Sequence, residues 1–281
     1  MLSAELQELR AEAQSYLQSL DQPCAPQAVA RHIFGPQRHE DPVAALLVRA
    51  ILEPMTCVER AHDGRWMALD ASYLEIPLDE ARLVAVDLET TGSLTGVDRI
   101  IEVGMAMLER GQIVKQFSSL CHSERHVSPR IRRLTGIKPS QLKEAPPFGE
   151  VAPVIVDMLQ GAHAFVAHDV RFDMPFLRWE LGRHGLEMPD APAVCTLQLA
   201  RSLWPDLDGW RLQDLAGTFA VAHTHPHRAG EDALATAGVL ARALLDARAL
   251  GARTLGDLYR LTSASRDLGE EDDLLEANAA G

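Results

Sequence analysis

The sequence has few cysteines and no long apolar run, and both absences limit what the protein can be. Its 4 cysteines, among 281 residues, are scattered without a Cys-x-x-Cys pair. This spacing argues against a zinc ribbon or a disulfide framework and fits a reducing cytoplasm. No apolar run approaches the roughly 20 residues of a membrane span, and no basic segment followed by an apolar one opens the chain. We expect a soluble, cytoplasmic protein with no membrane contact.

Basic residues are also few compared with acidic ones, and the formal net charge is −13. This balance is unusual for a protein that binds nucleic acid, which usually carries a basic surface. Part of the excess is local, because residues 266–281 carry a run of acids with a single arginine, typical of a disordered acidic tail. One loop-and-helix stretch has the opposite character. Its basic cluster, which either contacts phosphates or forms a solvated face, comprises Arg125, Arg130, Arg132, Arg133, Lys138 and Lys143.

The first 70 residues are predicted to form a small helical domain. Apolar spacing and turn signals indicate helices near 4–20, 25–35 and 42–52, and strands at 57–60 and 65–69. Asp41 is a natural N-cap for the third helix, and Asp63-Gly64 predicts a hairpin turn between the strands. Helices followed by a two-stranded ribbon resemble a winged helix-turn-helix domain. The alternative is an interaction module without DNA contact, because the segment shows no clear basic face.

The remaining chain is predicted to form a linker at 71–81, an α/β domain at 82–247, and a C-terminal helix with an acidic tail at 248–281. Hydrophobic residues make up 47% of the sequence, enough for a sizeable core. Three short-linked strands open the α/β domain, and helices then alternate with further strands. The predicted strands are near 83–89, 99–108, 113–117 and 163–167, and the helices near 148–159, 172–184, 196–203, 211–218 and 229–247. This order predicts a sheet with helices on both faces.

Two acids at the end of an apolar run are the first sign of chemistry. The run LVAVDLETTG at 83–92 reads as a buried strand that ends in a turn, with Asp87 and Glu89 two positions apart. Alternate side chains of a strand share one face, so these carboxylates emerge side by side. Such a pair needs a cation, and Mg²⁺ or Mn²⁺ suits oxygen ligands. The alternative is a solvated strand end.

Two further segments carry polar residues near helix starts. Asp173 precedes Pro175 at the start of a predicted helix, where the helix dipole favours an anion. The alternative is that Asp173 is a plain helix cap. Asp232 lies in the first turn or so of the long helix after Ala229, and His227 lies on the loop before it. His227 is either a mobile base above a metal site or a solvated loop residue. His223, His225 and His227 alternate along this loop, but no fourth ligand at matching spacing supports zinc.

Taken together, these residues resemble the DEDDh 3′→5′ exonuclease superfamily, which includes polymerase proofreading subunits and has a ribonuclease H-like fold. The three motifs are VDLETTG at 86–92, VAHDVRFDMPFL at 166–177 and HRAGEDA at 227–233, with weaker echoes in RIIEVG at 99–104, LTGI at 134–137 and CT at 195–196. The resemblance covers roughly residues 82–247 and leaves out the first 80. One position departs from the family, which usually has Asn where this chain has Asp169. An ionised Asp can only accept hydrogen bonds, so its carboxylate must find a donor.

The resemblance implies a two-metal site and a role for each matching residue. Asp87 would bridge two Mg²⁺ or Mn²⁺ ions, with Glu89 and Asp232 on the ion beside the nucleophile and Asp173 on the other. His227 would act as the general base, because histidine titrates close to neutral pH. The terminal nucleotide would be held by residues of the first two motifs, which are Leu88, Thr90, Thr91, His168 and Phe172, although Phe172 could equally be a core residue.

Several functions remain open from the sequence. The leading hypothesis is a 3′→5′ exonuclease that acts on single-stranded or frayed DNA 3′ ends, in proofreading or repair. An exoribonuclease of the same family would carry the same motifs. A winged-helix adaptor with an inactive nuclease-like domain is a third reading, which the intact polar set argues against. A proofreading subunit held by a DNA polymerase or repair partner is a fourth.

Overall fold

The structure is a computed structural model that describes residues 2–20, 22–36, 42–52, 55, 58–60, 64–68, 71–189 and 191–264. Backbone contacts divide the chain into a smaller unit, Met1–Glu75 with Thr254–Gly281, and a larger unit, Ile76–Arg253. The predicted helix cap at Asp41, the first part of the predicted hairpin turn and the predicted acidic tail lie outside the described residues. Each unit is considered separately below.

The smaller unit consists of helices and a short hairpin. Its elements are α1 (Leu2–Gln18), α2 (Pro26–Phe34), α3 (Pro42–Leu52), β1 (Val58–Arg60), β2 (Trp66–Ala68), α4 (Ala71–Leu74) and α12 (Leu255–Ala264). The hairpin strands β1 and β2 are antiparallel, as predicted. Gly64, at the end of the connecting turn, has a φ of +82°, which glycine adopts without steric cost. The predicted linker at 71–81 contains α4.

A backbone bridge ties the helices of the smaller unit to its hairpin. Cys24 and Trp66 exchange backbone hydrogen bonds of 2.6 and 2.7 Å between their N–H and C=O groups. The Trp66 side chain is buried among apolar residues of α1, α2 and α3, including Leu17, Val29 and Val48. Three helices and a hairpin follow one another in the predicted order, and the bridge between Cys24 and Trp66 was not predicted. That the unit is a winged helix stays a prediction.

The described residues of the larger unit form a five-stranded mixed sheet in the order β5-β4-β3-β6-β7. The strands are β3 (Arg82–Thr90), β4 (Ile100–Glu109), β5 (Gln112–Leu120), β6 (Ala164–Ala167) and β7 (Ala193–Cys195). As predicted, β3, β4 and β5 are an antiparallel meander. In contrast, β6 runs parallel to β3, and β7 runs parallel to β6. The apolar run before Asp87 lies at the centre of the sheet, where a strand is covered on both faces.

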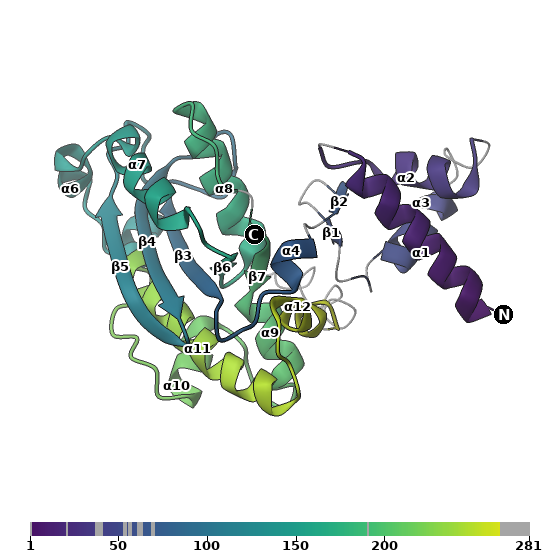
Figure 1. Cartoon of the computed structure of the whole chain (residues 1–281). Coiled ribbons are helices and arrows are strands. Elements are labelled where there is room, and N and C mark those ends of the chain that lie inside the picture. The colour runs from purple at the N-terminus through teal and green to yellow at the C-terminus, as the bar shows by residue number, and fades with distance from the viewer. Residues whose placement is uncertain are drawn as a thin grey trace. The chain divides into compact units, whose positions relative to one another are not determined.

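Helices cover both faces of this sheet, which confirms the predicted α/β, ribonuclease H-like fold class (Figure 1). Val84, Val86 and Leu88 of β3 pack in one cluster with apolar residues of α7 and α8. Helix α11 packs against β3 and β4. The helices of this unit are α5 (Pro129–Thr135), α6 (Pro139–Glu144), α7 (Phe148–Leu159), α8 (Val170–Arg183), α9 (Thr196–Leu203), α10 (Leu212–Thr218) and α11 (Ala229–Ala249).

The helix bounds predicted at 148–159 and 196–203 agree with α7 and α9, whereas short elements were missed. The stretch at 125–143 was predicted as loop and helix without bounds for α5 or α6, and β7 was not predicted; these elements have 7, 6 and 3 residues. Segments this short hold too few residues to show a periodicity, so their structure depends on tertiary packing.

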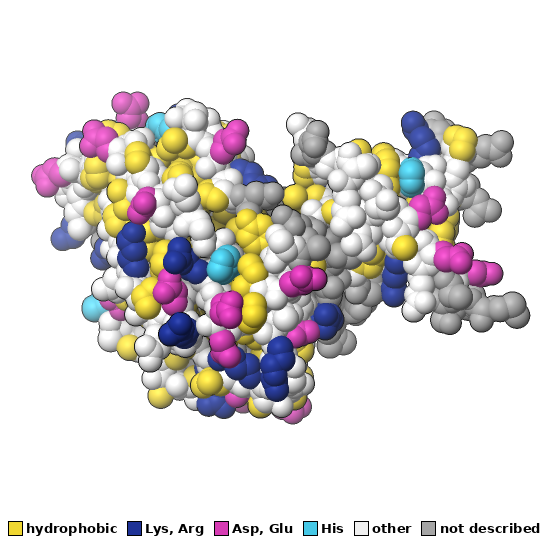
Figure 2. Space-filling view, viewed as in Figure 1, with side chains coloured by type: hydrophobic (Ala, Val, Ile, Leu, Met, Phe, Trp, Pro, Cys, Tyr) yellow, Lys and Arg dark blue, Asp and Glu magenta, His cyan; other side chains and the backbone are white. Residues whose placement is uncertain are grey.

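The displayed face of the described residues is mixed in charge. Figure 2 shows Lys and Arg side chains interspersed with Asp, Glu and hydrophobic side chains on the face that it displays. Among the residues that the structure describes, we find no helix with the length and hydropathy needed to cross a bilayer.

Gly104 of β4 controls how closely α11 approaches the sheet. A Cβ atom on Gly104 would lie 1.8 Å from the carbonyl oxygen of Ala229, so no side chain fits unless the start of α11 moves. We expect Gly104→Ala to lower the free energy of unfolding by about 1–3 kcal/mol, the usual cost of overpacking. Urea denaturation of the purified variant measures this change.

Gly182→Ala in α8 is the matched control, because no heavy atom lies within 4 Å of its added Cβ. An alanine inside a helix is favoured over glycine by up to about 1 kcal/mol, so this control should be neutral or stabilised. Equal stability of the two variants would contradict the tight approach of α11 to β4.

Candidate active site

The first two acidic residues lie on one face of β3 near its end. Asp87 pairs with Gly104 of β4 and Glu89 pairs with Glu102, so the acidic face of β3 continues onto the neighbouring strand. The register shifts between Glu89 and Thr90, which marks an irregularity where the strand ends. The strand period therefore places the two carboxylates side by side, as the sequence predicted.

The start of α11 is fixed to β4 by a buried carboxylate. Glu102 is 3% exposed and accepts hydrogen bonds from the Arg228 guanidinium, including one of 2.7 Å from Nη2. It also accepts a 3.1 Å bond from the backbone N–H of Ala229, an N–H in the first helical turn that has no partner within the helix. This anchor positions the residues on either side of it, His227 and Asp232.

Asp232 is buried and both of its carboxylate oxygens are engaged. Oδ2 accepts a 2.9 Å hydrogen bond from the backbone N–H of His227, and Oδ1 lies in a short contact with Nε2 of His223. His227 adopts a left-handed backbone conformation with a φ of +63°, uncommon for a residue with a side chain. This turn of the chain directs the N–H of His227 toward Asp232 and leaves its side chain exposed.

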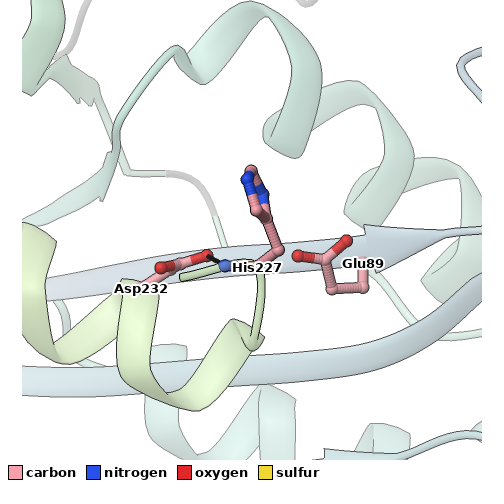
Figure 3. Close-up of side chains that lie close together, drawn as sticks. All are labelled: Glu89, His227 and Asp232. Atoms are coloured by element: carbon pink, nitrogen blue, oxygen red, sulfur yellow. Dashed lines mark hydrogen bonds between the residues drawn. The ribbon is translucent and has the colours of Figure 1, made fainter. Parts of the chain in front are cut away.

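Glu89, His227 and Asp232 come together at the end of β3 and the start of α11. One ligand atom from each residue lies within 4.8 Å of the others. Figure 3 shows the His227 side chain between the carboxylates of Glu89 and Asp232. A group of two carboxylates and an imidazole at this spacing provides ligand atoms for a divalent cation.

Asp173 approaches the same strand from α8. It is 4% exposed, and the backbone of Leu88 lies near enough to its carboxyl group to lower the pKa and so offset part of the effect of burial. Asp169, the N-cap of α8, has a left-handed φ of +91°. Its Oδ1 accepts bonds of 3.3 Å from the backbone N–H of Arg171 and 2.8 Å from Arg171 Nε. The carboxylate that replaces the family's usual Asn therefore finds its donor in Arg171.

The carboxylates of this region are buried close to one another, which disfavours their charged forms. Burial, followed by the charges of Asp173 and Asp232, raises the pKa of Asp87 well above its usual range. Burial and then the charge of Asp232 raise the pKa of Glu89 to about 8. Burial also raises the pKa of Asp173 well above its usual range. Such shifts occur where buried acids lie together without enough positive charge, which is the environment that a bound cation relieves.

Thr90 and Thr91 shape the turn after β3. The Thr90 hydroxyl donates to the carbonyl oxygen of Gly92 at 2.5 Å. The Thr91 hydroxyl donates to Asp98 Oδ1 at 3.0 Å and accepts from the backbone N–H of Arg99 at 3.0 Å. Both threonines are buried, so their side chains hold the loop from residues 91 to 99 beside the carboxylates.

His168 and Phe172 are the two predicted substrate contacts in the second motif. The ring of His168 lies 2.9 Å from the Thr196 hydroxyl through Nδ1 and 3.0 Å from the carbonyl oxygen of Trp210 through Nε2. Burial lowers the pKa of His168 to about 4, so the ring is neutral at pH 7. Phe172 is half-buried, and its ring centroid lies 4.9 Å from that of Phe176. A nucleotide contact of either residue stays a prediction.

Two residues with structural roles at the site were not assigned one from the sequence. Glu102 lies in a weak motif echo, and the signal was an acid inside a strand that is otherwise buried and apolar. His223 was considered only as a zinc ligand, whereas its side chain is 6% exposed and contacts Asp232. No sequence spacing connects Glu102 with Arg228, because they are 126 residues apart.

Comparison with curated proteins identifies relatives that match about two thirds of this chain. The 3′-5′ exonuclease DinG of Bacillus subtilis is 34% identical over 186 residues, which is 66% of this chain and 20% of the relative. A PolC-type DNA polymerase III of Caldanaerobacter subterraneus is 35% identical over 179 residues, 64% of this chain and 13% of the relative. The chain therefore spans a fifth or less of the length of these two relatives.

A solved structure of Exonuclease X, in complex with 5′ overhanging duplex DNA, is similar to 64% of this chain and to 99% of its own chain. The TM-score is 0.51 and the sequence identity 26%. In addition, residues 84–240 match the family model described as Exonuclease. This match contains Asp87, Glu89, Asp173, His227 and Asp232, and it covers more than half of the chain. The protein therefore belongs to the exonuclease family, in its DEDDh type.

Proposed function

We propose that the protein is a metal-dependent 3′→5′ exonuclease that releases 5′ nucleoside monophosphates from DNA 3′ ends. The observation that carries this proposal is the convergence of Glu89, His227 and Asp232 within 4.8 Å. Exonuclease X supports it, because the similarity to that enzyme extends over 99% of its chain. The part of this chain that resembles it therefore corresponds to nearly all of that solved exonuclease chain.

Two divalent cations, Mg²⁺ or Mn²⁺, are the cofactors that we assign to this site. The residues present fit them, because hard cations take carboxylate oxygens and burial has raised the pKa of Asp87, Glu89 and Asp173. These three residues and Asp232 would hold the ions. When bound, such a pair activates a water and stabilises the charge that develops on the phosphate and on the leaving oxygen.

The chain's own residues supply the proton transfer and the substrate position. His227 takes a proton from the attacking water at an unprotonated ring nitrogen. The water oxygen bonds to phosphorus, the bond from phosphorus to the 3′ oxygen breaks, and that oxygen takes a proton from solvent. The terminal nucleotide is cradled by Leu88, Thr90 and Thr91, with His168 and Phe172 beside them.

Single-stranded or frayed DNA 3′ ends are the substrate class that we favour, and RNA is the alternative. Exonuclease X was solved with a DNA duplex, and the motifs of the site do not separate the two nucleic acids. A polymerase partner is suggested by the PolC-type relative alone.

The proposal includes a division of the chain into a winged-helix-like domain at 1–70, a linker at 71–81, an exonuclease domain at 82–247 and a C-terminal segment. It also includes a cytoplasmic location, which the free cysteines Cys24, Cys121 and Cys195 support.

Substitutions of the site residues test the proposed chemistry. We expect Asp87→Asn and Asp232→Asn to abolish Mg²⁺-dependent hydrolysis, because each removes a charged metal ligand. His227→Ala should lower kcat by about 10²–10⁴-fold, the usual contribution of a general base, with little change in KM. The rates are measured on 5′-labelled DNA with a free 3′ end. His225→Ala, an exposed histidine two residues away, is the matched control.

The direction and nature of hydrolysis are tested on 3′- and 5′-labelled DNA and RNA oligonucleotides with Mg²⁺, Mn²⁺ or EDTA. The expected result is release of nucleotides from 3′ ends in both metals and none in EDTA. Activity that survives EDTA, or that starts at 5′ ends, would disprove the mechanism. A clear preference for RNA would favour the exoribonuclease alternative, and no activity on either would favour an inactive nuclease-like module.

Glu89 predicts a pH-dependent stability of the metal-free protein. Its pKa is about 8 in the folded protein against an ordinary 4.5, so the folded state holds its proton more tightly than the unfolded state. The free energy of unfolding should therefore decrease as pH rises from about 4.5 to about 8. Glu89→Gln should make this decrease smaller and should raise the Tm in EDTA above that of the natural protein near pH 8.

Thermal unfolding in EDTA across this pH range measures the effect, and Mg²⁺ should raise the Tm of the natural protein most at the alkaline end. Glu150→Gln is the control, because Glu150 lies in the first turn of α7, outside the carboxylate group. If Glu89→Gln and the natural protein showed the same dependence on pH, the electrostatic conflict at Glu89 would be refuted.

A further inference from the structure

One stretch of this acidic protein is uniformly basic. Between residues 125 and 143 the chain contains no Asp or Glu, while the whole protein carries a net charge of −13. The basic segment, as we call residues 125–143, comprises the loop before α5, α5 itself, α6 and the turn between them. Its cations, of which all but Arg132 are exposed, are Arg125, Arg130, Arg132, Arg133, Lys138 and Lys143.

The basic segment has a concave surface. A hollow of about 440 Å³ lies where α5 meets α6, and Arg132, Arg133 and Lys138 contribute to its lining. The Nε atom of Arg132 is buried and has no hydrogen-bond partner within the described part of the chain. A hollow lined by Arg132, Arg133 and Lys138 favours an anionic oxygen.

Apolar packing holds the basic segment on the strand that forms the active site. Val127, Ile137 and Leu142 are buried in one cluster with Ile101 of β4. Ile101 directly precedes Glu102, the residue that anchors the start of α11. The side chain of Ser128 accepts a hydrogen bond from the backbone N–H of Ile131 and caps α5. The cations of the basic segment therefore have a defined position relative to β4. In Figure 1, α6 lies near the ends of β4 and β5.

A chain of polar contacts links the basic segment to the turn beside the carboxylates. Thr91 donates a 3.0 Å hydrogen bond to Asp98 Oδ1, and Arg125 Nε lies 3.8 Å from the same oxygen. Thr91 is one of the residues proposed to cradle the terminal nucleotide. Arg125 thus begins a run of positive charge at the edge of the proposed substrate position.

We propose that the basic segment binds the phosphodiester backbone of the substrate strand, a few nucleotides to the 5′ side of the scissile bond. This inference rests on the proposed function. An enzyme that removes 3′-terminal nucleotides leaves the rest of its substrate strand extending in the 5′ direction, so the remaining phosphates must pass over a surface beside the site. In a protein with a net charge of −13 that surface needs local cations, and residues 125–143 supply them.

The test is a triple variant, Arg130→Gln, Arg133→Gln and Lys138→Gln, in the full-length protein. Its matched control removes three cations elsewhere on the larger unit, in Arg110→Gln, Lys115→Gln and Arg242→Gln. Arg110 and Lys115 are exposed, and Lys115 and Arg242 form ion pairs that are about half exposed and contribute little to stability. Both variants lose the same charge, so a difference between them reports position rather than net charge.

Two substrates separate backbone binding from chemistry. One is a long single-stranded thymidylate oligonucleotide, and the other is the p-nitrophenyl ester of thymidine 5′-monophosphate, which has a single phosphate. For the oligonucleotide, the slope of log KM against log salt should fall by about 2 in the triple variant, since each contact with a single strand contributes about 0.7. Its hydrolysis of the ester, its kcat and the salt slope of the control should match the natural protein.

Equal salt slopes in the triple variant and the control would overturn the inference. So would a loss of ester hydrolysis in the triple variant, because the substitutions would then act on the site or on folding. If the natural protein hydrolysed neither substrate in Mg²⁺ or Mn²⁺, the proposed function itself would fail. That outcome is distinguishable, because it concerns the unsubstituted protein.

Discussion

The close contact between β4 and the first turn of α11 holds the two halves of the candidate active site together. Gly104 allows the approach, since a Cβ atom there would collide with the Ala229 carbonyl. Glu102 then fixes it by accepting hydrogen bonds from Arg228 and from the Ala229 N–H. The carboxylates of β3 meet a helix that begins more than a hundred residues later. They meet because the neighbouring strand β4 carries both Gly104 and the buried Glu102.

Burying several carboxylates in one site costs free energy, which the packing of the rest of the fold has to offset. Asp87, Glu89 and Asp173 are buried together, and their pKa values are raised first by burial and then by the charges of neighbouring carboxylates. Apolar packing of β3 with α7 and α8 holds them in place in spite of this repulsion. A site that is costly in the metal-free protein is well matched to cations, and the same excess of acid is why we propose the basic segment as the surface that meets the substrate phosphates.

Much of the fold followed from local patterns, and the failures also have a local reason. The apolar run before Asp87 could be read as a buried strand, because a strand that is covered on both faces is apolar throughout. Pro175 was expected in the first turn of a helix near 172–184, whereas α8 begins at Val170 and contains Pro175 in its interior; Asp173 still lies in the first turn. Bounds for α5 and α6 within the predicted loop-and-helix stretch, and strand β7, were not predicted because each is too short to show a period. The basic segment was recognised as a cluster of charge, but its hollow depends on how Ile137 and Leu142 pack against Ile101.

The candidate metal ligands could therefore be proposed from the sequence, because strand period, helix starts and motif spacing are local properties. The contacts that make those residues a site are not local. Glu102 meets Arg228 across 126 residues, and Glu89 meets His227 and Asp232 across more than a hundred. Those pairings depend on which surfaces pack against β4, and burial there, rather than residue type, sets the raised pKa values of the carboxylates.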